Sequence, residues 1–165
     1  MRSDAAPART RWGLLRSDEI RRQLQPTVGT APARHPTAPG TGRYAPEAVG
    51  AVYAELVRRA RELLERGEPV IIDASWIDAG QRAVVRRVAE DTGSDLIELC
   101  CSCDDATAAE RIHRRQGGDD VSDATPEVRD LMAQKMNPWP SATVIDTSDA
   151  AVADVVSTAL RVVAG

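Results

Sequence analysis

Apolar positions recur in two patterns along the chain, as short unbroken runs and as repeats with a spacing of three or four residues. The longest repeat starts at Pro46 and includes Val52, Leu56 and Ala60, with arginines and glutamates mostly on the other side. Residues at this spacing share one face of a helix. The pattern therefore predicts an amphipathic helix that ends at Gly67.

The run Val70-Ile71-Ile72 follows this helix and has no polar alternation. Such a run predicts a central parallel strand, from Val70 to Ala74, that is buried on both faces. Asp73 would then lie at the carboxyl end of the strand, which is the edge where open α/β sheets bind ligands. The alternative is that Asp73 only caps the following segment.

The rest of the pattern predicts alternating strands and helices. Further strands are expected at residues 12–16, 95–101 and 142–146, and further helices at 17–24, 78–92, 106–115, 125–136 and 149–163. Ser17 and Asp78 are expected to cap two of these helices. This order indicates an α/β fold, a three-layer parallel sheet with flanking helices. Residues 1–11 are interpreted as a disordered leader, and residues 25–46, rich in proline and glycine, as a long loop.

Composition narrows the class of protein. The 165 residues amount to one domain, and a formal net charge of −4 gives no reason to expect nucleic acid or a membrane as a partner. Neither a membrane span nor a signal peptide is expected, so the protein is predicted to be cytoplasmic. Cys100, Cys101 and Cys103 do not have the spacing of a zinc site, and reduced thiols are expected there.

Charged side chains fall at the expected ligand-binding edge of the sheet. Asp18 follows the first strand, Asp73 follows the second, and Arg111, Arg114 and Arg115 end the helix after the third. Arginines three or four positions apart share a helix face and can clamp one polyanion, with residues 111–124 acting as a mobile lid. Carboxylates and arginines in this arrangement suit phosphoryl transfer. The alternative is that the arginines form a solvated helix face.

Several short stretches together resemble a known family. They are residues 14–21, Tyr53 on the helix that ends at 63–67, and residues 70–76, 111–115 and 122–124. In order and spacing they look like the P-loop kinase-like ATPases of the zeta-toxin, chloramphenicol phosphotransferase and polynucleotide kinase type. They are most similar to the bacterial AAA-type ATP-binding domain that is often fused behind an aminoglycoside-phosphotransferase-like domain. The resemblance covers about residues 12–163.

The resemblance implies a set of ligands and roles. ATP and Mg²⁺ would be the cofactors, and a small hydroxylated molecule would accept the phosphate. Asp18 would act as the base for the acceptor hydroxyl or as a substrate ligand, with Arg21 and Tyr53 also binding substrate, and Asp73 would hold Mg²⁺ through water. The further implied residues are Arg111 and Arg115 as catalytic groups of the lid, and Arg114, Arg115, Thr147 and Ser148 as contacts to the nucleotide.

One motif of that family is missing from the sequence. Members begin with a strand, a G-x-x-x-x-G-K-[ST] loop and a helix, whose backbone N–H groups and lysine hold the phosphates. The only lysine here is Lys135, which follows Gln134, and the glycine-rich residues 39–43 contain none. The first strand and the phosphate loop are therefore expected to be missing, through truncation, a mis-assigned start or degeneration.

Three interpretations stay open. The chain is an ATP- and Mg²⁺-dependent phosphotransferase domain of impaired activity, or a non-catalytic remnant or partner-binding module of the same fold. The third is a redox or metal protein that uses the cysteine cluster. No recognisable pattern encodes the acceptor or the oligomeric state.

Overall fold

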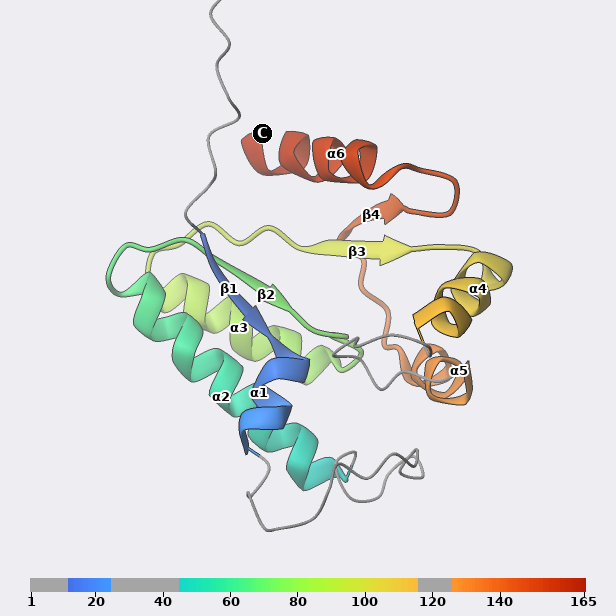
Figure 1. Cartoon of the computed structure of the whole chain (residues 1–165). Coiled ribbons are helices and arrows are strands. Elements are labelled where there is room, and N and C mark those ends of the chain that lie inside the picture. The colour runs from blue at the N-terminus through green and yellow to red at the C-terminus, as the bar shows by residue number, and fades with distance from the viewer. Residues whose placement is uncertain (1–11, 25–44, 116–125) are drawn as a thin grey trace, which may run out of the picture.

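A computed structural model describes residues 12–24, 45–115 and 126–165, in which strands and helices alternate (Figure 1). The elements are β1 (Gly13–Arg16), α1 (Ser17–Leu24), α2 (Pro46–Leu64), β2 (Val70–Asp73), α3 (Ala79–Asp91), β3 (Leu99–Ser102), α4 (Asp105–Arg115), α5 (Pro126–Lys135), β4 (Thr143–Asp146) and α6 (Val152–Ala164). This order confirms the α/β class. The expected leader, most of the proline-rich loop and most of the lid lie outside the described residues.

The strands are parallel and form two separate pairs. In the first pair Gly13 of β1 lies opposite Val70 of β2, and in the second Leu99 of β3 lies opposite Thr143 of β4. Among the residues that the structure describes, no strand joins β2 to β3, so the sheet is divided into two halves. The carboxyl ends of all four strands point to the right-hand side of Figure 1.

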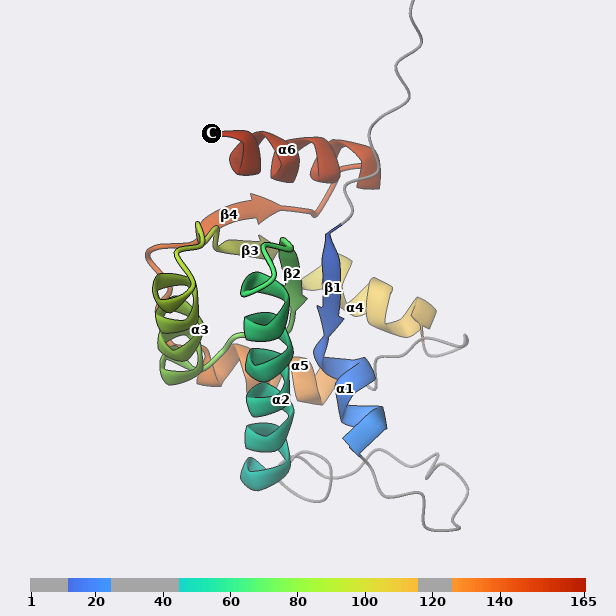
Figure 2. The ribbon, with the colours of Figure 1, turned by 90° about the vertical axis from the view of Figure 1, so that its left-hand side faces the viewer.

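Helices cover the strands from two sides. In Figures 1 and 2, α2 and α3 lie on one side of the strands and α6 lies on the other, over β4. The buried core lies between α1, α2 and one face of the β1–β2 pair, where Leu15 and Ile72 pack against buried Ile20 and Leu56. No described helix has the length and hydropathy of a membrane span.

The second face of the β1–β2 pair is uncovered, contrary to the prediction that residues 70–72 are buried on both faces. Leu14 is 57% exposed, and Ile71, its neighbour across the pair, is 46% exposed. The run is apolar, but among the described residues no strand pairs with the next edge of β2. The hydrophobicity of residues 70–72 indicates that their burial is favourable, but the tertiary structure leaves the Ile71 side of the run exposed.

Several element boundaries differ from the sequence-based ones. The third strand begins at Leu99 instead of 95, because β4 pairs only with Leu99–Ser102. The last helix begins at Val152 instead of 149, and Ser17 is the first residue of α1 instead of its cap. Asp78 does cap α3, since its carboxylate accepts the Gln81 N–H at 3.0 Å, and Gly67 ends the turn after α2 with φ +74°.

Candidate functional site

Charged residues gather at the carboxyl end of the β1–β2 pair and at the start of α1. Asp73 ends β2 and lies opposite Arg16, whose Nε donates to the Asp73 carboxylate at 3.1 Å. This hydrogen bond, reinforced by charge attraction, raises the Arg16 pKa, and the carboxylates of Glu19 and Asp18 add to the effect. Asp18 itself pairs with Arg21 on the same helix. Arg16 therefore pairs with Asp73, one of the two acidic positions expected at this edge.

Tyr53 reaches the same end of β2 from the adjacent helix α2. Its hydroxyl lies 3.1 Å from Ser75 Oγ and accepts the Trp76 N–H at 3.1 Å. Its ring meets the Trp76 ring edge-on, with centroids 5.1 Å apart. Tyr53 thus positions the turn that follows Asp73, and the substrate-binding role expected for it stays a prediction.

The β3–β4 pair forms a second cluster at its own carboxyl end. Arg111 of α4 donates to Thr147 Oγ1 at 3.0 Å, and that hydroxyl donates to the Ser102 carbonyl at 2.8 Å. Ser148 Oγ donates to Asp146 at 2.7 Å and accepts the Asp104 N–H at 2.9 Å. The structure therefore brings Arg111, Thr147 and Ser148 together, as parts of a network that holds the loop after β4.

Two carboxylates of this cluster are held in the charged form. The backbone N–H of Thr107, followed by its hydroxyl, donates to Asp104, so the Asp104 pKa is lowered to about 2. The backbone N–H and hydroxyl of Ser148 lower the Asp146 pKa in the same way. The sequence contained only weak signals for both residues: Asp104 precedes a predicted helix, and Asp146 ends a predicted strand.

The arginines expected in the lid have different surroundings. The Arg114 side chain is 72% exposed and pairs with Glu110 at 2.5 Å on the surface of α4. Arg111 instead contacts Thr147. Arg115 ends α4, and its side chain lies outside the described residues. The structure brings Arg111 and Arg114 to no common partner, and their lid roles stay predictions.

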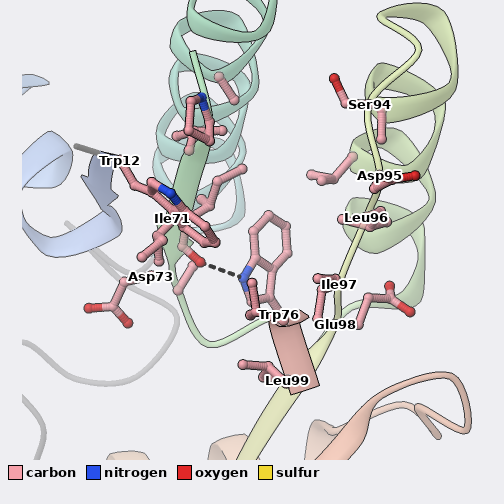
Figure 3. A pocket seen from close by; sticks show the side chains of 18 of the residues that line it. Trp12, Ile71, Asp73, Trp76, Ser94, Asp95, Leu96, Ile97, Glu98 and Leu99 are labelled. Carbon is pink, nitrogen blue, oxygen red and sulfur yellow. Dashed lines mark hydrogen bonds between the residues drawn. The ribbon is translucent and has the colours of Figure 1, made fainter. Parts of the chain in front are cut away.

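A groove of about 1150 Å³ separates the two halves of the site (Figure 3). It lies between β2 and β3 and is lined mainly by apolar side chains, among them Ile71, Trp76, Leu96 and Leu160. Cys101 lines its β3 side, where burial raises the thiol pKa, helped by the charges of Cys100 and Asp73. The described residues contain no cluster of three potential metal ligands.

Comparison with known proteins assigns the family. The model of a family described as an AAA domain matches residues 3–139. The chain belongs to this family. It is therefore a P-loop kinase-like AAA domain, as the sequence motifs indicated, and its class is that of nucleotide-binding, kinase-like domains.

Relatives of this AAA domain occur in mycobacteria. Proteins of Mycobacterium bovis and of two strains of Mycobacterium tuberculosis, each named only as an uncharacterized protein, are 38% identical over 135 residues. The match covers 82% of this chain but 26% of each relative, so the chain spans about a quarter of their length. Among solved structures, the tunicamycin resistance protein of Deinococcus radiodurans is 16% identical, with a TM-score of 0.48 over 92% of this chain and 79% of that one.

Proposed function

We propose that this AAA domain binds ATP with Mg²⁺ and descends from enzymes that transfer the γ-phosphate to a hydroxyl of a small molecule, with impaired activity in this chain. One observation carries the proposal. Asp73 ends β2 and lines the groove between β2 and β3, and Arg111 contacts Thr147 in the loop after β4, the strand that pairs with β3. Ligands of α/β folds bind at this edge.

The residues present fit Mg²⁺ only as a partner of phosphates. The Asp73 side chain is 57% exposed, and Arg16 engages one of its two carboxylate oxygens, so the other is available to a hard cation or its water shell. Mg²⁺ keeps several waters and takes few protein ligands when phosphates are present, which suits this single carboxylate. The ion, when bound, neutralises charge on the phosphates.

Side chains of the domain would serve the acceptor and the transferred group. Asp18, held by Arg21, would orient the acceptor hydroxyl and take its proton. Arg114 and Arg115, at the end of α4, would stabilise negative charge on the transferring group if the helix end moves toward the nucleotide. Arg111 would hold Thr147 and Ser148 in place beside the adenine of the nucleotide.

The impairment follows from the phosphate-binding chemistry. No lysine of the sequence follows a glycine, and Lys135 is an exposed residue at the end of α5. Without a glycine-presented lysine the β- and γ-phosphates lose their main cationic partner. A non-catalytic, partner-binding module is the second candidate function, and the open apolar groove between β2 and β3 favours it.

Titration with Mg·ATP tests the nucleotide-binding proposal. We expect a dissociation constant above about 1 mM, because the main phosphate site is lacking. In amide NMR spectra at about 10 mM Mg·ATP, the shifts are expected at residues 73–76 and 146–148, at the carboxyl ends of the strands. Sub-millimolar affinity would contradict the impairment, and shifts confined to other regions would contradict the site.

The variant Asp73→Asn isolates the metal role. It keeps the size of the side chain but removes the charge, so the enhancement of ATP binding by Mg²⁺ is expected to disappear while the weak metal-free binding remains. The matched control is Asp91→Asn. The Asp91 carboxylate pairs with Arg61 at the far end of α3, so this variant is expected to leave both the Mg²⁺ enhancement and the metal-free ATP binding unchanged. Equal Mg²⁺ enhancement in Asp73→Asn and the unmodified protein would remove Asp73 from this role.

A further inference from the structure

Asp73 already has a cationic partner in the structure. Parallel pairing places Arg16, the last residue of β1, opposite Asp73, the last residue of β2. The Arg16 Nε donates to Asp73 Oδ2 at 3.1 Å, so one positive charge offsets the charge of the carboxylate. A divalent cation that binds Asp73 therefore meets the charge of Arg16 close to its own position.

A second carboxylate lies within reach of the same guanidinium. Glu19 is in the first turn of α1, and its Oε1 lies 3.9 Å from Arg16 Nη1. This distance is longer than that of a hydrogen bond, so Glu19 attracts Arg16 through charge alone. The hydrogen bond and charge of Asp73, and to a lesser degree the charge of Glu19, raise the Arg16 pKa. Arg16 thus has one close acidic partner and one alternative partner.

The contacts of Arg16 are exposed enough to exchange. The side chains of Arg16, Asp73 and Glu19 are 39%, 57% and 49% exposed. Water and salt screen an ion pair in such surroundings, so its contribution to an equilibrium constant is about fivefold or less. Rotation about the bonds of a long side chain moves its charged end between two such partners and leaves the backbone in place.

Asp18 is the third carboxylate that affects Arg16, and it has a different partner. Its carboxylate pairs with Arg21, one turn further along α1. The two guanidiniums are therefore divided among the three carboxylates, with Arg21 on Asp18 and Arg16 close to Asp73 and Glu19. The group as a whole has an excess of negative charge, which favours a further cation.

We infer that Arg16 is a positioning residue that controls the access of Mg²⁺ to Asp73. In the metal-free protein its guanidinium balances the charge of Asp73, and it moves to Glu19 when the ion binds. The inference rests on the proposed role of Asp73 as the Mg²⁺ ligand. It differs from a purely structural ion pair in one consequence, because removal of the Arg16 charge strengthens the binding of the ion.

Titration with MgCl₂ without nucleotide, at constant ionic strength, tests the inference. Amide NMR shifts at residues 73–76 report the ion, and the part that is lost in Asp73→Asn defines binding at Asp73. We expect a dissociation constant above about 5 mM for the unmodified protein, because a single carboxylate holds Mg²⁺ weakly. Arg16→Gln is expected to bind Mg²⁺ about five- to tenfold more tightly, since the competing charge is removed.

Two variants separate the position of the charge from its amount. Arg22→Gln removes an equal charge from an exposed position of α1, and its Mg²⁺ affinity is expected to stay within about twofold of the unmodified protein. Arg16→Lys keeps the charge and is expected to bind Mg²⁺ nearly as weakly as the unmodified protein. Equal tightening in Arg16→Gln and Arg22→Gln, or unchanged affinity in Arg16→Gln, would overturn the inference.

Substitution of Glu19 tests the movement of Arg16. Glu19→Gln removes the alternative partner, so Mg²⁺ binding is expected to weaken about two- to threefold. In the Arg16→Gln background the same substitution is expected to change the affinity by less than about 1.5-fold, because Glu19 acts through Arg16. An equal effect in both backgrounds would show that Glu19 attracts the ion directly and would overturn the proposed movement.

The Arg16 Nε–H signal, assigned by its loss in Arg16→Lys, reports the hydrogen bond to Asp73. Saturating Mg²⁺ is expected to shift this signal toward its position in Asp73→Asn, and an unmoved signal would overturn the inference. Binding that depends on Asp73 but not on Arg16 would overturn the inference alone. Equal Mg²⁺ shifts in Asp73→Asn, Arg16→Gln and the unmodified protein would overturn it together with the proposed metal role of Asp73.

Discussion

Trp76 has a backbone φ of +50°, in the left-handed region that a bulky side chain rarely adopts. It lies three residues after Asp73, and Tyr53 holds it through a hydrogen bond to its N–H and an edge-on ring contact. Strained residues persist only where the surroundings determine their conformation. The Tyr53 hydroxyl is therefore expected to maintain the turn beside the candidate site.

Tyr53→Phe tests this dependence. The substitution removes one hydroxyl that serves Ser75 and the Trp76 N–H, so we expect the free energy of unfolding to fall by about 1–2 kcal/mol. Ser75→Ala, which removes only the Ser75 contact, is the matched control and is expected to cost less. Urea unfolding followed by tryptophan fluorescence measures both. Equal losses in the two variants would show that the bond to Trp76 does not stabilise the turn.

Arg82 is a buried residue whose guanidinium donates hydrogen bonds to backbone carbonyl groups. It is 3% exposed and donates to the carbonyls of Trp76 at 2.5 Å and Pro138 at 2.8 Å, while its guanidinium carbon lies 4.9 Å from the centre of the Trp139 ring. It thereby joins the turn after β2 to the segment before β4. The sequence contained a signal, because Arg82 occupies the apolar face of its helix, three residues before Val85.

Arg82→Ala is expected to lower the free energy of unfolding by about 3 kcal/mol, since it removes the buried guanidinium that donates to the Trp76 and Pro138 carbonyls and contacts the Trp139 ring. Arg87→Ala, on an exposed position of the same helix, is the matched control and is expected to change stability by less than about 0.5 kcal/mol. Chemical denaturation measures both values. Similar stability of the two variants would mean that Arg82 does not join these segments.

The start of α4 and the loop after β4 form one hydrogen-bonded unit. Asp104 accepts from the N–H and hydroxyl of Thr107 at 2.8 and 2.7 Å, and its own N–H donates to Ser148. Ser148 in turn donates to Asp146. Both carboxylates have lowered pKa values in the folded protein, so folding favours their charged forms.

Acid is therefore expected to weaken this unit. A carboxylate whose pKa is lowered on folding contributes its stability above its unfolded pKa and loses it as pH falls through the folded value. For Asp104 this window runs from about pH 4 to about pH 2. Asp104→Asn is expected to show a smaller fall in the free energy of unfolding across this window than the unmodified protein.

Urea unfolding at several pH values measures this difference. Asp149→Asn, an exposed residue of the same loop, is the control and is expected to keep the pH dependence of the unmodified protein. Identical pH dependence in Asp104→Asn and the unmodified protein would show that Asp104 is not the acid-sensitive group.

At the scale of the whole molecule, local patterns predicted the elements better than their assembly. The repeat that includes Val52 and Leu56 and the run at 70–72 correctly indicated a helix and the next strand. Arg16 was missed as the partner of Asp73, because the two residues are 57 positions apart and meet only through the parallel register of β1 and β2. Ile71 was expected to be buried, but whether a face is covered depends on segments distant in the sequence.

The sequence by itself determined the order of strands and helices, the family, and the placement of Asp18 and Asp73 near strand ends, because these depend on neighbouring residues and their periodicity. Only the tertiary structure decided that Arg16 neutralises Asp73, that Arg111 holds Thr147, and that a groove divides the sheet. These features depend on strand pairing and burial, which join residues that no local pattern connects.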